Sequence, residues 1–184
     1  MHITFRDLII LYPLIFLAGF VDSIAGGGGL ISLPAYLFVG LPSHNALATN
    51  KLSSTIGTIF STLRYAKGRA IVYLVAFPSA VGALIGSHIG AKLALVLSDN
   101  VLKFVLAFLI PLAAVIVLLA NPRKERTLEV ENVSKTRAVV VSGLIGLTIG
   151  TYDGFFGPGT GTFLIILYVS FLSLDHVSAS GTAK

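Results

Sequence analysis

The sequence predicts an all-α fold: a polytopic transmembrane helical bundle with two homologous halves and glycine-broken helices. Of the 184 residues, 55% are hydrophobic and 11% are charged, whereas a soluble domain usually carries about 25% charged residues. Long apolar runs occur at Leu8–Val21, Ala70–Leu97 and Val101–Ala120, and Ala138–Tyr152 opens another. A helix needs roughly 20 apolar residues to cross a bilayer, so these runs predict several crossings.

Glycine interrupts the first apolar region. The run Leu8–Val21 is expected to form a helix that ends at Asp22, and residues 26–29 are all glycine. Glycine weakens a helix, so the backbone is expected to break there. The apolar stretch that follows, Leu30–Val39, is too short to span a bilayer alone. The sequence therefore predicts either a discontinuous span or a re-entrant hairpin.

The positive charge of the chain, +5 in total, is concentrated in two short connections at residues 64–69 and 123–137. Short basic loops between apolar spans mark the cytoplasmic side, so this charge indicates membrane topology and not nucleic-acid binding. If Leu8–Val39 crosses once, the N-terminus is cytoplasmic and the two halves are parallel repeats, the arrangement we favour. If that segment is re-entrant, the halves are inverted.

Two pairs of sequence blocks indicate an internal duplication. Gly19–Gly28 resembles Gly150–Gly159, and Leu41–Lys51 resembles Leu174–Lys184, with four identities in each pair and with order and spacing kept. We divide the chain into a first transmembrane repeat (1–120), a cytoplasmic basic linker (121–137) and the start of a second repeat (138–184). The first copy continues through three further apolar segments, so the second is expected to be truncated at Lys184.

Four charged residues occur in the same order in both copies. Asp22 and Asp153 lie beside the glycine-rich breaks, and Lys51 and Lys184 lie in the helices that follow. A charge at bilayer depth costs at least about 2.5–3.5 kcal/mol, so these four require a reason. One interpretation is an anion site that uses the lysines and the backbone N–H groups of the breaks. The other is structural, with the carboxylates capping broken helices and forming ion pairs with the lysines.

The helix expected after Pro42 carries a polar stripe. Lys51, Thr55, Thr58 and Thr62 lie on one face at helical spacing. The stripe predicts either a wall facing a wetter interior or hydroxyl groups that bond carbonyls of their own helix.

Small residues recur in the next helix. Gly82, Gly86 and Gly90 are spaced four apart. This spacing predicts close packing against another helix.

The region from Gly19 to Pro34, the segment Ala48-Thr-Asn-Lys51-Leu-Ser-Ser, and the second copy from Asp153 to Lys184 together resemble the TauE/SafE family of membrane transporters, which includes sulfite and organosulfonate exporters. The resemblance runs from about Leu8 to Lys184 and implies a multi-pass inner-membrane protein. The residues expected to line the substrate or ion pathway are Asp22, Gly26, Gly27, Gly28, Gly29, Asn50, Lys51, Asp153, Gly157, Gly159, Gly161 and Lys184.

We therefore expect export of a small anion such as sulfite or an organosulfonate, with Asp22 or Asp153 as a proton carrier. The alternative is a non-transporting membrane scaffold or subunit. The sequence contains no cysteine and no nucleotide, metalloprotease or serine-hydrolase motif, so we expect no enzyme, cofactor or metal. The expected partners are the lipid bilayer and the anion, and a homo-oligomer is left open.

Overall fold

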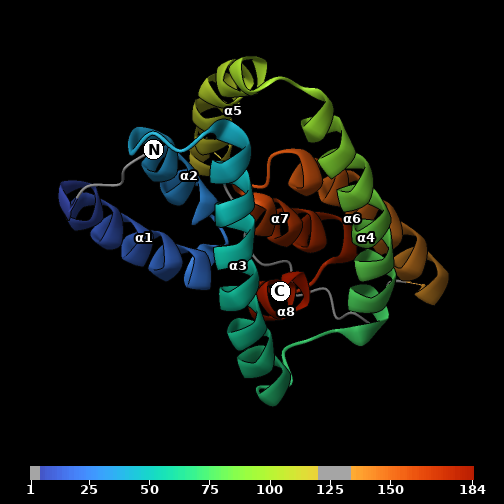
Figure 1. The fold of residues 1–184 in the computed structure, drawn as a ribbon. Helices are drawn as coiled ribbons and strands as arrows, with labels where there is room; N and C mark the ends of the chain where they lie inside the picture. Colours follow the sequence, from blue (N-terminus) through green and yellow to red (C-terminus); the bar gives the residue numbers. More distant parts are fainter. Residues whose placement is uncertain (1–4, 120–133) are drawn as a thin grey trace.

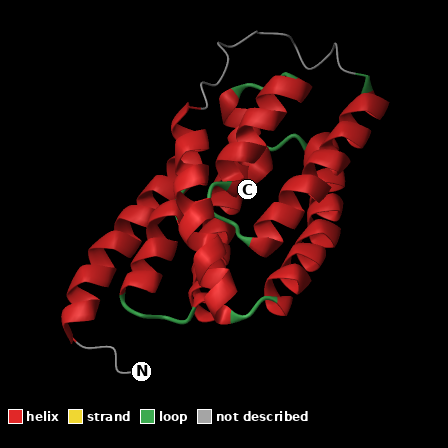
Figure 2. Cartoon of the chain, turned by 90° about the horizontal axis from the view of Figure 1, so that it is seen from above, coloured by secondary structure: helices red, strands yellow, loops and turns green. Residues whose placement is uncertain are grey.

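The computed structural model describes residues 5–119 and 134–184, and every regular element within these ranges is a helix (Figure 1). The helices are α1 (Phe5–Ala25), α2 (Gly29–Phe38), α3 (Ser43–Lys67), α4 (Tyr73–Val96), α5 (Asp99–Leu119), α6 (Lys135–Phe155), α7 (Thr160–Leu172) and α8 (His176–Ala183). Figure 2 shows the same bundle from above, with the helices connected by short loops. The predicted all-α fold is confirmed.

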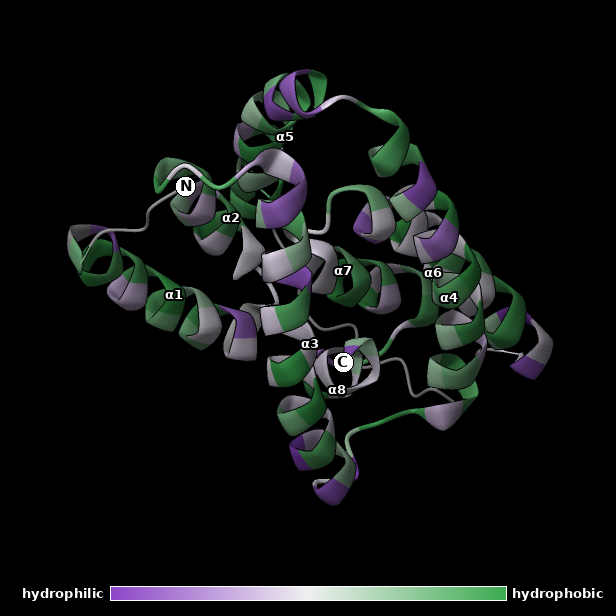
Figure 3. Ribbon diagram, in the orientation of Figure 1, coloured by the Kyte–Doolittle hydropathy of each residue, from purple (hydrophilic) through white to green (hydrophobic). Residues whose placement is uncertain are grey.

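Three helices of the described chain are long and apolar enough to cross a membrane, namely α4, α5 and α6. The helices α2 and α7 are also apolar but shorter. Large apolar side chains such as Phe16, Phe60 and Phe104 are exposed on the outside of the bundle, and Figure 3 shows hydrophobic residues along most of the helices. An exposed apolar surface of this extent is typical of a protein surrounded by lipid.

The helices α1 and α2 form a hairpin around the first glycine-rich break. The prediction that α1 ends at Asp22 is wrong by one turn, because the helix continues to Ala25 and Asp22 lies in its last turn. A Cβ atom built on Gly28 would lie 2.3 Å from the carbonyl oxygen of Ala18, so the chain folds back tightly onto α1. The helices α1 and α2 therefore form a hairpin, the local arrangement that the re-entrant alternative requires. The expectation of a cytoplasmic N-terminus stays a prediction.

The helices α6 and α7 form a second hairpin around the second break. Tyr168 and Leu172, near the end of α7, pack in one apolar cluster with Ile145 in the middle of α6, so α7 runs back along α6. The helix α6 begins at Lys135, inside the range that we assigned to the basic linker. The rest of that linker up to residue 133 lies outside the described residues.

The helices α4 and α6 pack in parallel over most of their length. A Cβ atom on Gly82 would lie 2.3 Å from the carbonyl oxygen of Gly143, and one on Gly86 would lie 2.2 Å from that of Leu147. The contacts advance by four residues along both helices, so the two chains run in the same direction. The prediction that this glycine stripe packs against another helix is confirmed, and its partner is α6.

This parallel packing predicts which loops share a side of the membrane. Because the chain has no natural cysteine, single-cysteine variants can report sidedness. We expect Gly68→Cys, in the connection between α3 and α4, and Thr136→Cys, at the start of α6, to react with an impermeant maleimide from the same side. Ser98→Cys, beyond the far end of α4, is expected to react only from the other side. Reaction of the first two from opposite sides would contradict the parallel pair.

The helix α3 crosses the front of the bundle and is held at its N-terminal end (Figure 1). The backbone N–H of His44 and its Nδ1 atom each lie 3.3 Å from Oδ1 of Asp99, the first residue of α5. Ser43 donates a longer bond, 3.4 Å, to the carbonyl oxygen of the same aspartate. The start of α3 is thereby fixed beside the α4–α5 turn, and its middle faces the two hairpins.

Candidate functional site

The two helix breaks contact each other in the middle of the bundle. A Cβ atom on Gly26 would lie 2.7 Å from Cα of Gly161, and one on Gly29 would lie 3.0 Å from Cα of Pro158. The first contact leaves no room for a side chain, and the second would require Pro158 to shift. The glycines therefore allow two broken backbones, far apart in sequence, to touch.

The two breaks share a backbone feature as well as a composition. Gly26 has φ +73° and Gly157 has φ +95°, and each follows its aspartate by four residues. Side-chain-bearing residues rarely adopt this region, because the Cβ atom clashes with the backbone. The glycine at this position permits the helix to stop and the chain to reverse.

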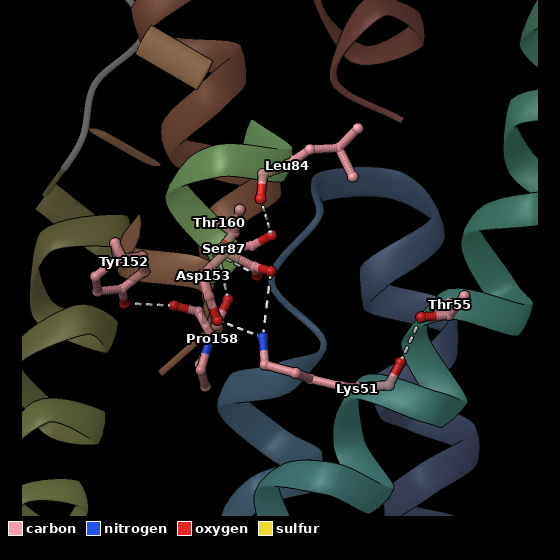
Figure 4. A network of polar contacts seen from close by, with 9 residues as sticks. Lys51, Thr55, Leu84, Ser87, Tyr152, Asp153, Pro158 and Thr160 are labelled. Atoms are coloured by element: carbon pink, nitrogen blue, oxygen red, sulfur yellow. Dashed lines mark hydrogen bonds and ion pairs between the residues drawn. The ribbon is translucent and has the colours of Figure 1, made fainter. Parts of the chain in front are cut away.

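Each lysine of the site pairs with the aspartate beside the other break. Nζ of Lys51 lies 3.2 Å from Oδ2 of Asp153 and also bonds the main-chain carbonyl of that residue (Figure 4). Nζ of Lys184 lies 2.9 Å from the carbonyl oxygen of Asp22 and 3.5 Å from its Oδ2. The two ion pairs are therefore crossed, and each lysine also neutralises carbonyl charge at the end of a broken helix.

The carboxylates also hold the breaks themselves. Oδ1 of Asp22 accepts a 3.1 Å hydrogen bond from the backbone N–H of Gly28. Oδ1 of Asp153 accepts a 2.9 Å bond from the hydroxyl of Thr160 (Figure 4). Each aspartate thus joins the last turn of one helix to the start of the next, so a structural role is satisfied at both positions.

The crossed pairs lie on an open cavity of about 780 Å³ that is lined by parts of α1, α2, α3, α4, α6, α7 and α8. Ten of the twelve residues predicted for the pathway line it: Asp22, Gly26, Gly29, Asn50, Lys51, Asp153, Gly157, Gly159, Gly161 and Lys184. The other two, Gly27 and Gly28, are buried but do not line the cavity. The structure therefore brings together charged residues from both ends of the chain around one space.

The polar stripe of α3 forms one wall of this cavity. Lys51, Thr55, Thr58 and Thr62 all line it. The hydroxyls of Thr55 and Thr62 also donate to carbonyl oxygens of their own helix, at 2.7 and 2.8 Å. The interpretation that these hydroxyls bond carbonyls of their own helix is confirmed for Thr55 and Thr62. Such a hydroxyl still presents lone pairs to the cavity, and a wetter interior stays a prediction.

Several polar contacts of the site were not predicted. The hydroxyl of Tyr152 donates a 2.6 Å bond to the carbonyl oxygen of Pro158 and so braces the second break. Ser79 and Tyr168 share a 2.6 Å bond across the cavity wall. The sequence offered a signal for Thr160, which donates to Asp153, because Thr160 directly follows Gly159, the glycine that aligns with Gly28 of the first break. Nothing local to Ser79 or Tyr168 indicates their contact, since they are far apart in the sequence.

Among the described residues, no cluster of three or more His, Asp or Glu side chains could hold a metal ion. The arrangement consists of facing helix breaks, crossed ion pairs within apolar helices, and a cavity with a hydroxyl-lined wall. These features define the class of polytopic membrane transporters that build a site from discontinuous helices.

Comparison with known families agrees with this class. The family described as Sulfite exporter TauE/SafE matches residues 11–184. The chain belongs to the TauE/SafE family and is a multi-pass membrane protein of transporter type.

The chain is similar to several curated proteins of this kind. It is 35% identical to the probable membrane transporter protein ORF9 of Sinorhizobium sp, over 99% of this chain and 68% of that protein. It is 32% identical to the probable membrane transporter protein YfcA of Escherichia coli strain K12, over 98% and 69% of the two chains. A probable membrane transporter protein of Haemophilus influenzae is 35% identical, over 100% of this chain and 71% of that protein. No solved structure matches the chain.

Proposed function

We propose that this protein exports a small anion, such as sulfite or an organosulfonate, across the inner membrane. The observation that carries the proposal is the pair of crossed lysine–aspartate contacts on one cavity between two helix breaks. Lysines at membrane depth are costly unless they are used. We place the substrate beside Lys51, because its side chain is 35% exposed whereas that of Lys184 is 8% exposed.

The charge balance of the site supports a mechanism in which anion binding and proton binding are coupled. Two lysines and two aspartates cancel, so an anion gains full attraction to Lys51 only when the carboxylate of Asp153 moves away or takes a proton. Anion binding and protonation of Asp153 are then mutually favourable. An inside-negative potential contributes about 2.3 kcal/mol per charge per 100 mV to outward movement of an anion. This contribution favours export of an anion that leaves without the proton, because a monoanion that leaves together with a proton carries no net charge.

The arrangement of the hairpins supports inverted halves. The α1–α2 hairpin opens toward the side where α3 starts next to Asp99. The α6–α7 hairpin opens toward the start of α4, where Leu174 packs with Val75. We propose that the two hairpins enter the membrane from opposite sides, as in transporters with inverted repeats.

A second candidate function is a non-transporting scaffold or subunit. The observation in its favour is that both aspartates already bond the breaks and both lysines already bond the carbonyls of those aspartates. Every charge then has a structural partner. The family is a transporter family, so we infer transport as the main role and no enzymatic activity.

The proposal predicts the effect of removing the carboxylate charge beside Lys51. In Asp153→Asn the amide can still accept from Thr160 but no longer competes for Lys51. With a small alkyl sulfonate, whose own charge is constant near neutrality, we expect the half-saturating concentration for efflux to fall in this variant relative to the parent protein.

Sulfonate efflux from cells or proteoliposomes measures this effect. Replacing both carboxylates, Asp22→Asn with Asp153→Asn, removes every proton carrier that we assign to the site. Unchanged efflux in the double variant would remove both aspartates from the mechanism.

A further inference from the structure

Asn50, the residue before Lys51 on α3, is a buried amide on the cavity. Its exposed fraction is 7%, and it lines the same space as Lys51. Ser32 of α2 contacts its Oδ1 atom at 2.5 Å, and lies at a longer 3.2 Å from the carbonyl oxygen of Gly28. Since Ser32 has one hydroxyl proton, the shorter contact takes it. This bond fixes Oδ1 toward α2 and turns the NH₂ group away from Ser32.

The NH₂ group of Asn50 lies where the two helix breaks meet. A Cβ atom on Gly29 would be 3.4 Å from Nδ2 of Asn50 and 3.0 Å from Cα of Pro158. Among the described residues, no buried side-chain nitrogen or oxygen is left without a hydrogen-bond partner, and Asn50 lines the cavity, so its NH₂ group opens on that space. The arrangement therefore leaves a donor that a bound ligand can use.

The start of α2 supplies a second set of donors at the same place. The first N–H groups of a helix have no partner within it and carry a partial positive charge. The N–H of Gly28 is taken by Asp22, and that of Leu30 bonds the carbonyl of Gly27. Gly29 lies between them in the first turn of α2. Gly29, Asn50 and Lys51 all line the cavity, so the start of α2, the amide and a full positive charge border the same space.

We propose that Nδ2 of Asn50 and the N–H of Gly29 bind an oxygen of the transported anion, with Lys51 supplying the charge. This inference rests on the proposed function and assigns Asn50 as its specificity-determining residue. The ligand class is a deprotonated oxyanion, because oxygens that only accept match donors that only donate. Ser32 acts as a positioning residue, since it fixes which end of the amide faces the cavity.

The test compares Asn50→Asp, which keeps the shape but replaces the donor by an acceptor, with the purified parent protein. We expect the dissociation constants for sulfite and for ethanesulfonate to rise at least about tenfold, the worth of one hydrogen bond to a charged group. Asn45→Asp makes the same chemical change at an exposed position of α3 away from the cavity, and binding should not change. Asn50→Leu provides the same loss of donor without a new charge, in case the aspartate variant does not fold.

A second set of variants tests the role of Ser32. We expect Ser32→Ala to weaken anion binding about threefold to tenfold, because the amide can then turn, and Ser32→Thr to restore it. Ser61→Ala removes a hydroxyl that bonds only its own helix, and should bind as the parent does. A purely structural contact would lower stability in Ser32→Ala without changing the affinity.

The outcomes separate this inference from the proposed function. Weakened binding in both Asn50→Asp and Lys51→Met supports both. Weakened binding in Lys51→Met alone overturns the role of Asn50 and leaves the anion site standing. Parent-like binding in both variants overturns the anion site as well.

Discussion

Gly86→Ala is expected to lower the free energy of unfolding by about 3 kcal/mol, the upper part of the usual range for overpacking. The new methyl group would lie 2.2 Å from the carbonyl oxygen of Leu147 and 2.7 Å from the backbone nitrogen of Thr151. These are main-chain atoms of α6, so no side chain can move aside and the two helices must separate. Equilibrium unfolding of the purified protein in SDS-containing micelles measures the loss.

Two other glycines provide matched controls for this variant. A methyl group on Gly143, in the same pair of helices, would lie 3.8 Å from the carbonyl oxygen of Pro78, an ordinary contact. One on Gly57 of α3 would meet nothing within 4 Å. Alanine is a better helix former than glycine by about 1 kcal/mol, so both variants are expected to be neutral or slightly stabilised. Equal destabilisation of all three would mean that the close α4–α6 contact does not hold the fold.

The α4–α6 pair shows how far the sequence predicts the fold. The spacing of Gly82, Gly86 and Gly90 identifies a face that another helix approaches, because small residues there have a steric meaning. It does not identify the partner. The complementary stripe on α6, Gly146, Gly150 and Gly154, is visible in the sequence, but which two stripes meet depends on how all the helices pack.

The candidate site was predicted in composition but not in connectivity. The aligned glycine and charge patterns indicate both breaks and all four charged residues. They do not say that Lys51 reaches Asp153 and Lys184 reaches Asp22, since equal patterns allow pairing within a copy or across copies. The bond between Ser32 and Asn50 could not be predicted either, because the sequence around a serine on an apolar helix does not indicate which residue it bonds.

Lys51→Met is the variant that best separates transport from scaffolding. Methionine keeps the length and apolar stem of the side chain and removes only the charge. Lys51 and Asp153 are 35% and 40% exposed, and such a pair contributes at most about 1 kcal/mol to stability. Lys184 is a poorer choice, because its side chain is only 8% exposed. Its replacement would leave the carboxylate of Asp22 without its lysine partner, and breaking a buried ion pair costs about 3–5 kcal/mol. A loss of activity in a Lys184 variant would then be confounded with a loss of fold.

We expect Lys51→Met to fold like the parent and to weaken anion binding about 50-fold, which corresponds to about 2.3 kcal/mol for one charge-assisted contact. Efflux at low substrate concentration should fall in the same proportion. Lys67→Met removes the same charge from the exposed end of α3, outside the cavity, and should transport normally. A scaffold would tolerate Lys51→Met or become more stable, because an uncharged side chain is cheaper to hold among apolar helices. Normal efflux in Lys51→Met, together with raised stability, would therefore favour the scaffold and remove the lysine from any anion pathway.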